Sequence, residues 1–325
     1  MIHLLHAELT RFTSRKIVWI AFGLVLLALA GMIALLSLET AAPSAAERTD
    51  AQTYFEESRS DWEANHVQYE KECRADPSVP DADQNCVYPE PQMSDYLNQL
   101  SFTEVGPLVA LIGVGFLGLA SAIVASSMIG ADFGTGSMSN WLSFIPVRWR
   151  VYASKLVVTV VGPVILSAAI SALAIATMGL VVTAQQGSAA VTGWDQVWGA
   201  YGRGIVVIGF GAILGGTVGF ITRRTIAGVG IILGYLIVKL LMTSIFGFSA
   251  WFAATQPWWP ENNALAVLQA DYVYQVAQQT VTAAGTQIDY VERTLHWEHG
   301  LVYLLVGAAV LLAAGLVTFT RRDVT

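Results

Sequence analysis

The chain has 325 residues, of which 54% are hydrophobic and only 13% are charged, whereas soluble domains carry about 25% charged residues. This composition excludes an ordinary soluble globule. The net charge is −7 and no basic stripe is present, which excludes nucleic acid as a partner. A helix needs about 20 apolar residues to cross a bilayer core, so the positions of the few charges predict the ends of the membrane spans.

Long charge-poor segments predict an all-α integral membrane protein, since open sheet edges are not tolerated in hydrocarbon. Six transmembrane helices are expected, at residues 17–38, 105–131, 156–183, 200–222, 225–247 and 299–320. The first follows a basic stretch, as an export signal does, but a signal's apolar region runs about 7 to 15 residues. We therefore expect this segment to remain as an uncleaved first helix.

The charges are distributed unequally between the two sides of the predicted helices. One side carries ten of the 17 Lys and Arg residues but only three of the 24 acids, Glu8, Asp132 and Asp323. The positive-inside rule then predicts a multi-pass protein of the cell membrane with both termini in the cytoplasm. The ten basic residues are Arg11, Arg15, Lys16, Arg148, Arg150, Lys155, Arg223, Arg224, Arg321 and Arg322.

Two larger loops, residues 39–104 and 248–298, are predicted to be extracellular. In the first, Phe55, Trp62 and Tyr69 recur with Cys73 at helical spacings among acids, which predicts an amphipathic helix. A turn rich in proline follows over residues 75–91. In the second loop, tryptophans precede residues 262–279, whose composition is typical of a helical segment at the membrane interface.

Cys73 and Cys86 are the only cysteines, and both fall in the first outer loop. That compartment permits oxidation. We predict a disulfide between them, which would stabilise the loop by about 3 kcal/mol.

Several kinds of chemistry lack the residues they require. None of the four lysines follows a glycine, so the chain has no phosphate-binding loop for ATP hydrolysis. His296 and His299 could share a metal only with further ligands, and we predict neither a metal site nor catalytic residues. An intramembrane enzyme is therefore the weakest hypothesis.

The most specific pattern lies between the second and third predicted helices, at residues 132–155. Asp132 is followed by Gly136, a short apolar stretch, Pro146, and then three basic residues, Arg148, Arg150 and Lys155. This pattern resembles the type-2 permease family of ATP-binding-cassette (ABC) transporters, in which Glu is usual at the position of Asp132 and Thr at the position of Ser137. Positive-inside anchoring alone is the alternative for each basic residue.

The resemblance extends to residues 1–16, which are similar to the amphipathic elbow helix of that family and contain Glu8, Arg11, Arg15 and Lys16. Leu5, Leu9 and Phe12 continue from Ile2 at helical spacing, which predicts a helix in the inner headgroup layer.

The resemblance implies a permease subunit that moves an amphipathic or hydrophobic molecule, such as an antibiotic, peptide or lipid, out of the cell. It also implies a second permease chain, identical or different, and a cytoplasmic ABC ATPase that carries ATP and Mg and binds near residues 132–150. Membrane lipid is the remaining partner, and this chain itself is expected to bind no cofactor. The alternative is a non-transporting membrane sensor or scaffold with a ligand-binding extracellular domain.

Two features inside the predicted helices have open interpretations. Gly211, Gly215 and Gly219 predict close helix packing, either within the chain or at a dimer seam. Lys239 follows Arg224 by fifteen residues, about 22 Å along a helix. It would either extend to the outer headgroups or lie in the substrate path, facing an anionic cargo or Glu104.

Overall fold

The computed structural model describes residues 2–76, 85–97, 99–247, 249–282 and 285–322. Within these residues, six helices are long and apolar enough to cross a membrane, and each covers a predicted span to within one residue. They are α2 (Lys16–Glu39), α5 (Phe102–Gly134), α7 (Arg148–Gln186), α8 (Trp194–Thr222), α9 (Thr225–Phe246) and α12 (Trp297–Arg321).

Helix α5 occupies the centre of the bundle and packs against α2, α7, α8 and α9. In its most apolar stretch 56% of the residues are buried, whereas in α9 only 6% are. The bundle core is therefore built around α5, and α9 lies at its edge.

Three glycines of α8, Gly211, Gly215 and Gly219, let this helix approach α5 closely. A Cβ atom at Gly211 would lie 2.8 Å from the carbonyl oxygen of Gly118, and one at Gly219 would lie 2.9 Å from that of Ser126. At Gly215 a Cβ would overlap the carbonyl group of Ala122. These three glycines therefore pack against another helix of the same chain. The sequence alone had left open whether they pack within the chain or at a dimer seam.

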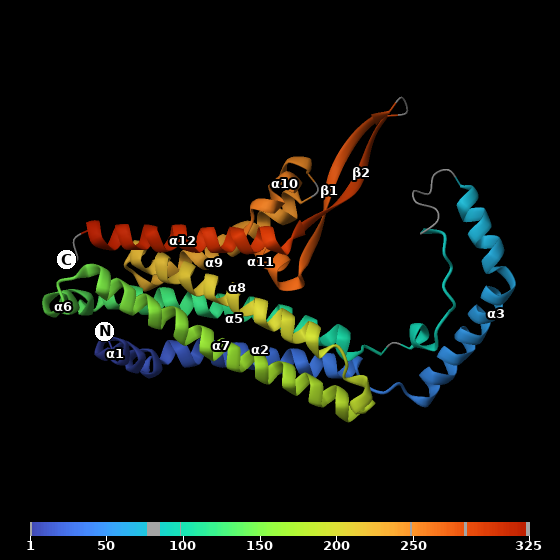
Figure 1. Ribbon diagram of the computed structural model, residues 1–325, viewed down its shortest axis with the longest axis horizontal. Coiled ribbons are helices and arrows are strands. Elements are labelled where there is room, and N and C mark those ends of the chain that lie inside the picture. The colour runs from blue at the N-terminus through green and yellow to red at the C-terminus, as the bar shows by residue number, and fades with distance from the viewer. Residues whose placement is uncertain (1, 77–84, 98, 248, 283–284, 323–325) are drawn as a thin grey trace.

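The two ends of the bundle carry different elements (Figure 1). Helix α1 (Ile2–Ser14), the short α6 (Ser137–Phe144) and both termini lie at one end, which we call the basic end. The long α3 (Ala45–Ala75) and a β-hairpin extend from the opposite end, called here the outer end.

The helix predicted in the first outer loop is present as α3. Ser44 and Glu47 form a capping box at its start, which satisfies two free backbone N–H groups. Its aromatic face holds the returning segment 85–97: the ring centroid of Phe55 lies 6.1 Å from that of Tyr96, and Trp62 Nε1 donates to the carbonyl of Tyr88 at 2.9 Å.

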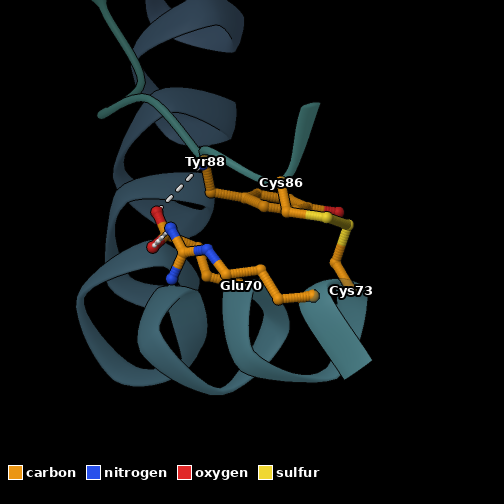
Figure 2. Close-up of a disulfide and its surroundings, with 5 residues drawn as sticks. Glu70, Cys73, Cys86 and Tyr88 are labelled. Atoms are coloured by element: carbon orange, nitrogen blue, oxygen red, sulfur yellow. Dashed lines mark hydrogen bonds and ion pairs between the residues drawn. A yellow bond between two sulfur atoms is a disulfide. The ribbon is translucent and has the colours of Figure 1, made fainter. Parts of the chain in front are cut away.

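The predicted disulfide between Cys73 and Cys86 is present and closes the same segment (Figure 2). Beside it, the backbone N–H of Tyr88 donates to Glu70 Oε1 at 3.1 Å. This hydrogen bond is the main reason that the pKa of Glu70 lies below its ordinary value, because it stabilises the charged form. Residues 77–84 of the predicted turn, and Asp323, lie outside the described residues.

The spanning bundle is all-helical, as predicted, but the second outer loop also contains two strands. Helices α10 (Ala250–Thr255) and α11 (Pro260–Gln269) are followed by two antiparallel strands, β1 (Asp271–Thr282) and β2 (Gly285–His296). The helical interpretation of residues 262–279 is wrong beyond Gln269. Ala270 has φ 68° and ends α11, and the next residues include Tyr272, Val273 and Tyr274, aromatic and β-branched types that favour a strand. The hairpin projects away from the bundle (Figure 1).

Three short turns of 3₁₀ helix complete the described elements. They are η1 (Met93–Tyr96), η2 (Ser188–Ala190) and η3 (Gln256–Trp258).

Candidate coupling site at the basic end

A buried ion-pair cluster joins α1, α5 and α7 at the basic end. Glu8 of α1, Asp132 near the end of α5 and Lys155 of α7 are 3%, 5% and 1% exposed. Lys155 Nζ lies 2.9 Å from Glu8 Oε1 and also donates to Asp132 Oδ2. Charged groups are tolerated in such surroundings only when they are paired, so these three side chains fix the relative positions of three helices.

Two arginines complete this cluster. Arg15 Nη2 lies 2.5 Å from Asp132 Oδ1, while Arg11 Nη1 lies 3.7 Å from Glu8 Oε1 and 3.8 Å from Asp132 Oδ2. Arg15 is the residue with extended backbone between α1 and α2. The ion pair with Asp132 therefore stabilises the non-helical backbone at Arg15, where the chain changes direction between α1 and α2.

Trp141 attaches α6 to the same cluster. The Arg11 guanidinium lies 5.4 Å from the centroid of the Trp141 ring, and Lys155 Nζ lies 5.8 Å from it, within the range of cation–π attraction. Arg11 Nη1 also lies 3.4 Å from Ser137 Oγ, its acceptor on α6. A displacement of α6 would therefore act directly on the side chains that hold α1, α5 and α7 together.

The segment predicted to couple the second and third helices is shorter in the structure than 132–155, because α5 runs on to Gly134 and α7 begins at Arg148. Gly136 has φ 70° and precedes the first residue of α6, a left-handed conformation that glycine adopts without strain. Pro146 is exposed in the connection between α6 and α7.

The remaining predicted basic residues do not join the cluster. Arg148 Nη1 donates to the carbonyl oxygens of Thr320 and Arg322, each at 2.9 Å, and so ties the start of α7 to the end of α12. Arg150 and Lys16 are exposed. Arg148 therefore has an internal structural contact, whereas Arg150 is accessible to a partner.

Two exposed aromatic side chains lie close in sequence to the connection between α6 and α7. Phe144 at the end of α6 is 85% exposed, and Trp149 in the first turn of α7 is 53% exposed. Exposed apolar patches rimmed by polar residues mark interaction sites. We call Phe144, Trp149 and Arg150 the α6–α7 surface.

Lys239 has a carboxylate partner, but a different one from that proposed on sequence grounds. Its Nζ lies 2.8 Å from Glu261 Oε1 of α11 and 3.6 Å from the centroid of the Trp259 ring. Glu104 instead accepts hydrogen bonds from Ser101 in the capping box of α5. The proposed Lys239–Glu104 pair is therefore wrong, because Glu104 is used at the start of its own helix and α11 brings Glu261 to Lys239.

Sequence reasoning named Glu8, Arg11, Arg15, Asp132 and Lys155, and the structure brings all five together. It missed Trp141, whose place in a short apolar stretch that precedes Arg148 and Arg150 was the available signal. It also missed Glu261, which no local pattern connects to Lys239.

At the basic end, the ion-pair cluster holds α1, α5 and α7 together, and the α6–α7 surface is exposed. Among the residues that the structure describes, no group of three His, Cys, Asp or Glu side chains could hold a metal ion. The fold and the cluster define a helical protein with six helices able to cross a membrane. No protein-family model, curated protein or solved structure matches the chain.

Proposed function

We propose that the chain is the membrane-spanning permease subunit of an ABC exporter, located in the cell membrane with both termini in the cytoplasm. A second permease chain and a separate cytoplasmic ATPase, which binds ATP and Mg, would complete the transporter. The observation that carries the proposal is the linkage of α6, through Trp141, to the buried cluster of Glu8, Asp132 and Lys155. A partner that pushes on α6 would move α1, α5 and α7 as one body.

The α6–α7 surface supports this proposal, because it offers a docking site at the end of the bundle where both termini lie (Figure 1). Phe144 would insert into a groove on the ATPase, and Arg150 would face acidic residues around it. When the ATPases approach one another, α6 would transmit the motion to the cluster and the helices would rock between inward-open and outward-open packings. In the same proposal α1 lies in the inner headgroup layer, and an amphipathic or hydrophobic molecule is the cargo.

The second candidate is a sensor or scaffold that does not transport. The outer elements favour it, because α3 and the hairpin extend well beyond the bundle (Figure 1) and the disulfide closes the first of them. The two functions differ in their partners: a permease copurifies with an ATPase whose turnover depends on it, and a sensor does not.

The test is affinity purification of the tagged full-length chain from its native membrane, followed by measurement of associated ATPase turnover. Phe144→Asp is expected to lose the ATPase while its abundance in the membrane and its elution volume stay unchanged. Val67→Asp is the matched control, because Val67 is an equally apolar residue, 68% exposed, on α3 at the outer end. It should retain the ATPase.

Two results would contradict the proposal. One is a wild-type chain that carries no ATPase activity under conditions that preserve the complex. The other is a Phe144→Asp variant with unchanged ATPase turnover, which would remove the docking role of the α6–α7 surface.

A further inference from the structure

A cavity of about 650 Å³ opens at the outer end between α5, α8 and the turn that joins α11 to β1. Pro107, Leu108 and Leu111 of α5 form an apolar wall, and Asp195 and Arg203 of α8 contribute charged groups of opposite sign. Neither charged residue belongs to the cluster at the basic end.

Hydrogen bonds fix the position of the Arg203 guanidinium and leave some of its N–H donors unused. Nε and Nη2 donate to the carbonyl oxygen of Leu268 at 3.3 and 3.1 Å. Nη1 lies beside Gly199, 3.3 Å from where a Cβ atom would stand. The side chain therefore runs back one turn toward the start of α8, the direction that helical side chains favour. An arginine has five N–H donors, and within the described residues Nη1 has no acceptor.

Asp195 lies in the first turn of α8 and is exposed, with no ion pair among the residues that the structure describes. It precedes Gly199 by one helical turn, so its level along the helix axis is about 6 Å from that of the Arg203 guanidinium. The Asp195 carboxylate and the Arg203 guanidinium thus line the same cavity at different depths along α8, and they do not form an ion pair with each other.

The order of these groups matches the depth profile of a bilayer. Helix α8 has 29 residues and is about 43 Å long, so a hydrocarbon core of about 30 Å leaves about 7 Å of helix beyond each boundary if it is centred. Asp195 then lies at the level of the headgroups and the Arg203 guanidinium at the boundary. The apolar wall of α5 lines the same cavity, where acyl chains would lie.

We propose that this cavity binds a phospholipid with a phosphoethanolamine headgroup. The phosphate would accept a charge-assisted hydrogen bond from Arg203 Nη1, and the ammonium group, two carbons further on, would face Asp195. The acyl chains would lie along Pro107, Leu108 and Leu111. A lipid with an anionic glycerol headgroup satisfies Arg203 equally well but brings no cation to Asp195, so the site discriminates between the two. This proposal is independent of the transport function.

The test is native mass spectrometry of the purified full-length chain, equilibrated in micelles that contain equal amounts of phosphatidylethanolamine and phosphatidylglycerol of the same chain length. The wild type is expected to retain phosphatidylethanolamine in preference, by about tenfold for one charge-assisted contact. Asp195→Asn should abolish this preference while phosphatidylglycerol is still retained. Leu111→Trp, which fills the cavity without changing a charge, should reduce retention of both lipids.

Arg150→Gln is the control, since it removes a cation from the basic end and should leave the lipid ratio unchanged. Equal retention of the two lipids by the wild type would overturn the proposal, as would an unchanged preference in Asp195→Asn. Inorganic phosphate serves as the competing probe. If millimolar phosphate displaced the bound lipid completely, the cavity would be a site for free phosphate and the lipid assignment would be wrong.

Discussion

Replacing Lys155 by methionine removes the one ammonium group that contacts both buried carboxylates, and it keeps most of the volume of the side chain. Two carboxylates and three cations form the cluster. In the variant, Asp132 keeps Arg15 at 2.5 Å, but Glu8 keeps only Arg11, at 3.7 Å and with a side chain that is 37% exposed. Glu8 is therefore the carboxylate that loses its effective partner.

The expected loss of stability follows from this difference. Removing one partner of a buried ion pair costs about 3–5 kcal/mol, because the other charge stays buried without compensation. Lys155→Met should lie near the lower limit, at about 3 kcal/mol, since Arg15 still neutralises Asp132. Asp132→Asn leaves three cations around one carboxylate and should approach about 5 kcal/mol. The double variant should cost about 1–3 kcal/mol less than the sum of the two.

The measurement is the free energy of unfolding of the purified chain in detergent, from a denaturant titration followed by tryptophan fluorescence. Lys16→Met is the matched control, because Lys16 is an exposed lysine next to the same helix junction, and it should unfold as the wild type does. Strict additivity of Lys155→Met and Asp132→Asn would refute the pairing, and so would a Lys155→Met variant with wild-type stability.

Four further outcomes are expected. Gly215→Val should destabilise the bundle by about 3 kcal/mol or more, because the new side chain overlaps an α5 carbonyl. Gly23→Val is the control and should not destabilise it, because a Cβ at Gly23 meets nothing within 4 Å. Equal thermal unfolding midpoints for these two variants would contradict the prediction. Cys73→Ser should lower the stability of the outer segment by about 3 kcal/mol, and alkylation of wild-type cysteines before reduction would show that no bridge exists. Because the pKa of Glu70 lies below its ordinary value, its contribution to stability is present above an unfolded pKa of about 4.3 and lost as the pH falls through the lower folded value; limited proteolysis of segment 85–97 should become faster there, and Glu70→Gln should remove that dependence. Lys239→Met should reduce transport in proteoliposomes whereas Lys239→Arg keeps part of it, and wild-type rates in both would exclude Lys239 from the substrate path.

The sequence predicted the spans and α3 well because both are local patterns. An apolar run of sufficient length defines a span wherever it occurs, and the spacing of Phe55, Trp62 and Tyr69 defines one helical face. The hairpin was missed because residues 262–279 begin with a good helical composition, and the change to strand depends on the left-handed Ala270. A single non-glycine residue in that conformation leaves no signal in composition.

The ion-pair partners of Lys155 and Lys239 could not be predicted from the sequence, for a different reason. Lys155 and Glu8 are 147 residues apart, and their contact depends on how α1 turns at Arg15 and packs on α7. Lys239 was recognised as a charge that needs a partner, but α11 had first to fold back onto the bundle to supply Glu261. Sequence shows which charges are costly to bury, and tertiary packing decides which of them meet.

Both ends of the bundle fasten a non-spanning element to a spanning helix in the same way. At the basic end α1 supplies Glu8 to Lys155 of α7, and at the outer end α11 supplies Glu261 to Lys239 of α9. In each case a tryptophan ring lies against the lysine, as a cation–π partner. The Lys155–Glu8 contact is buried and costly to break singly, so α1 should move with α7. Lys239 and Glu261 are 17% and 36% exposed, so their contact holds α11 to α9 less strongly. In the transport cycle proposed here, α1 would therefore move together with α7 as one body.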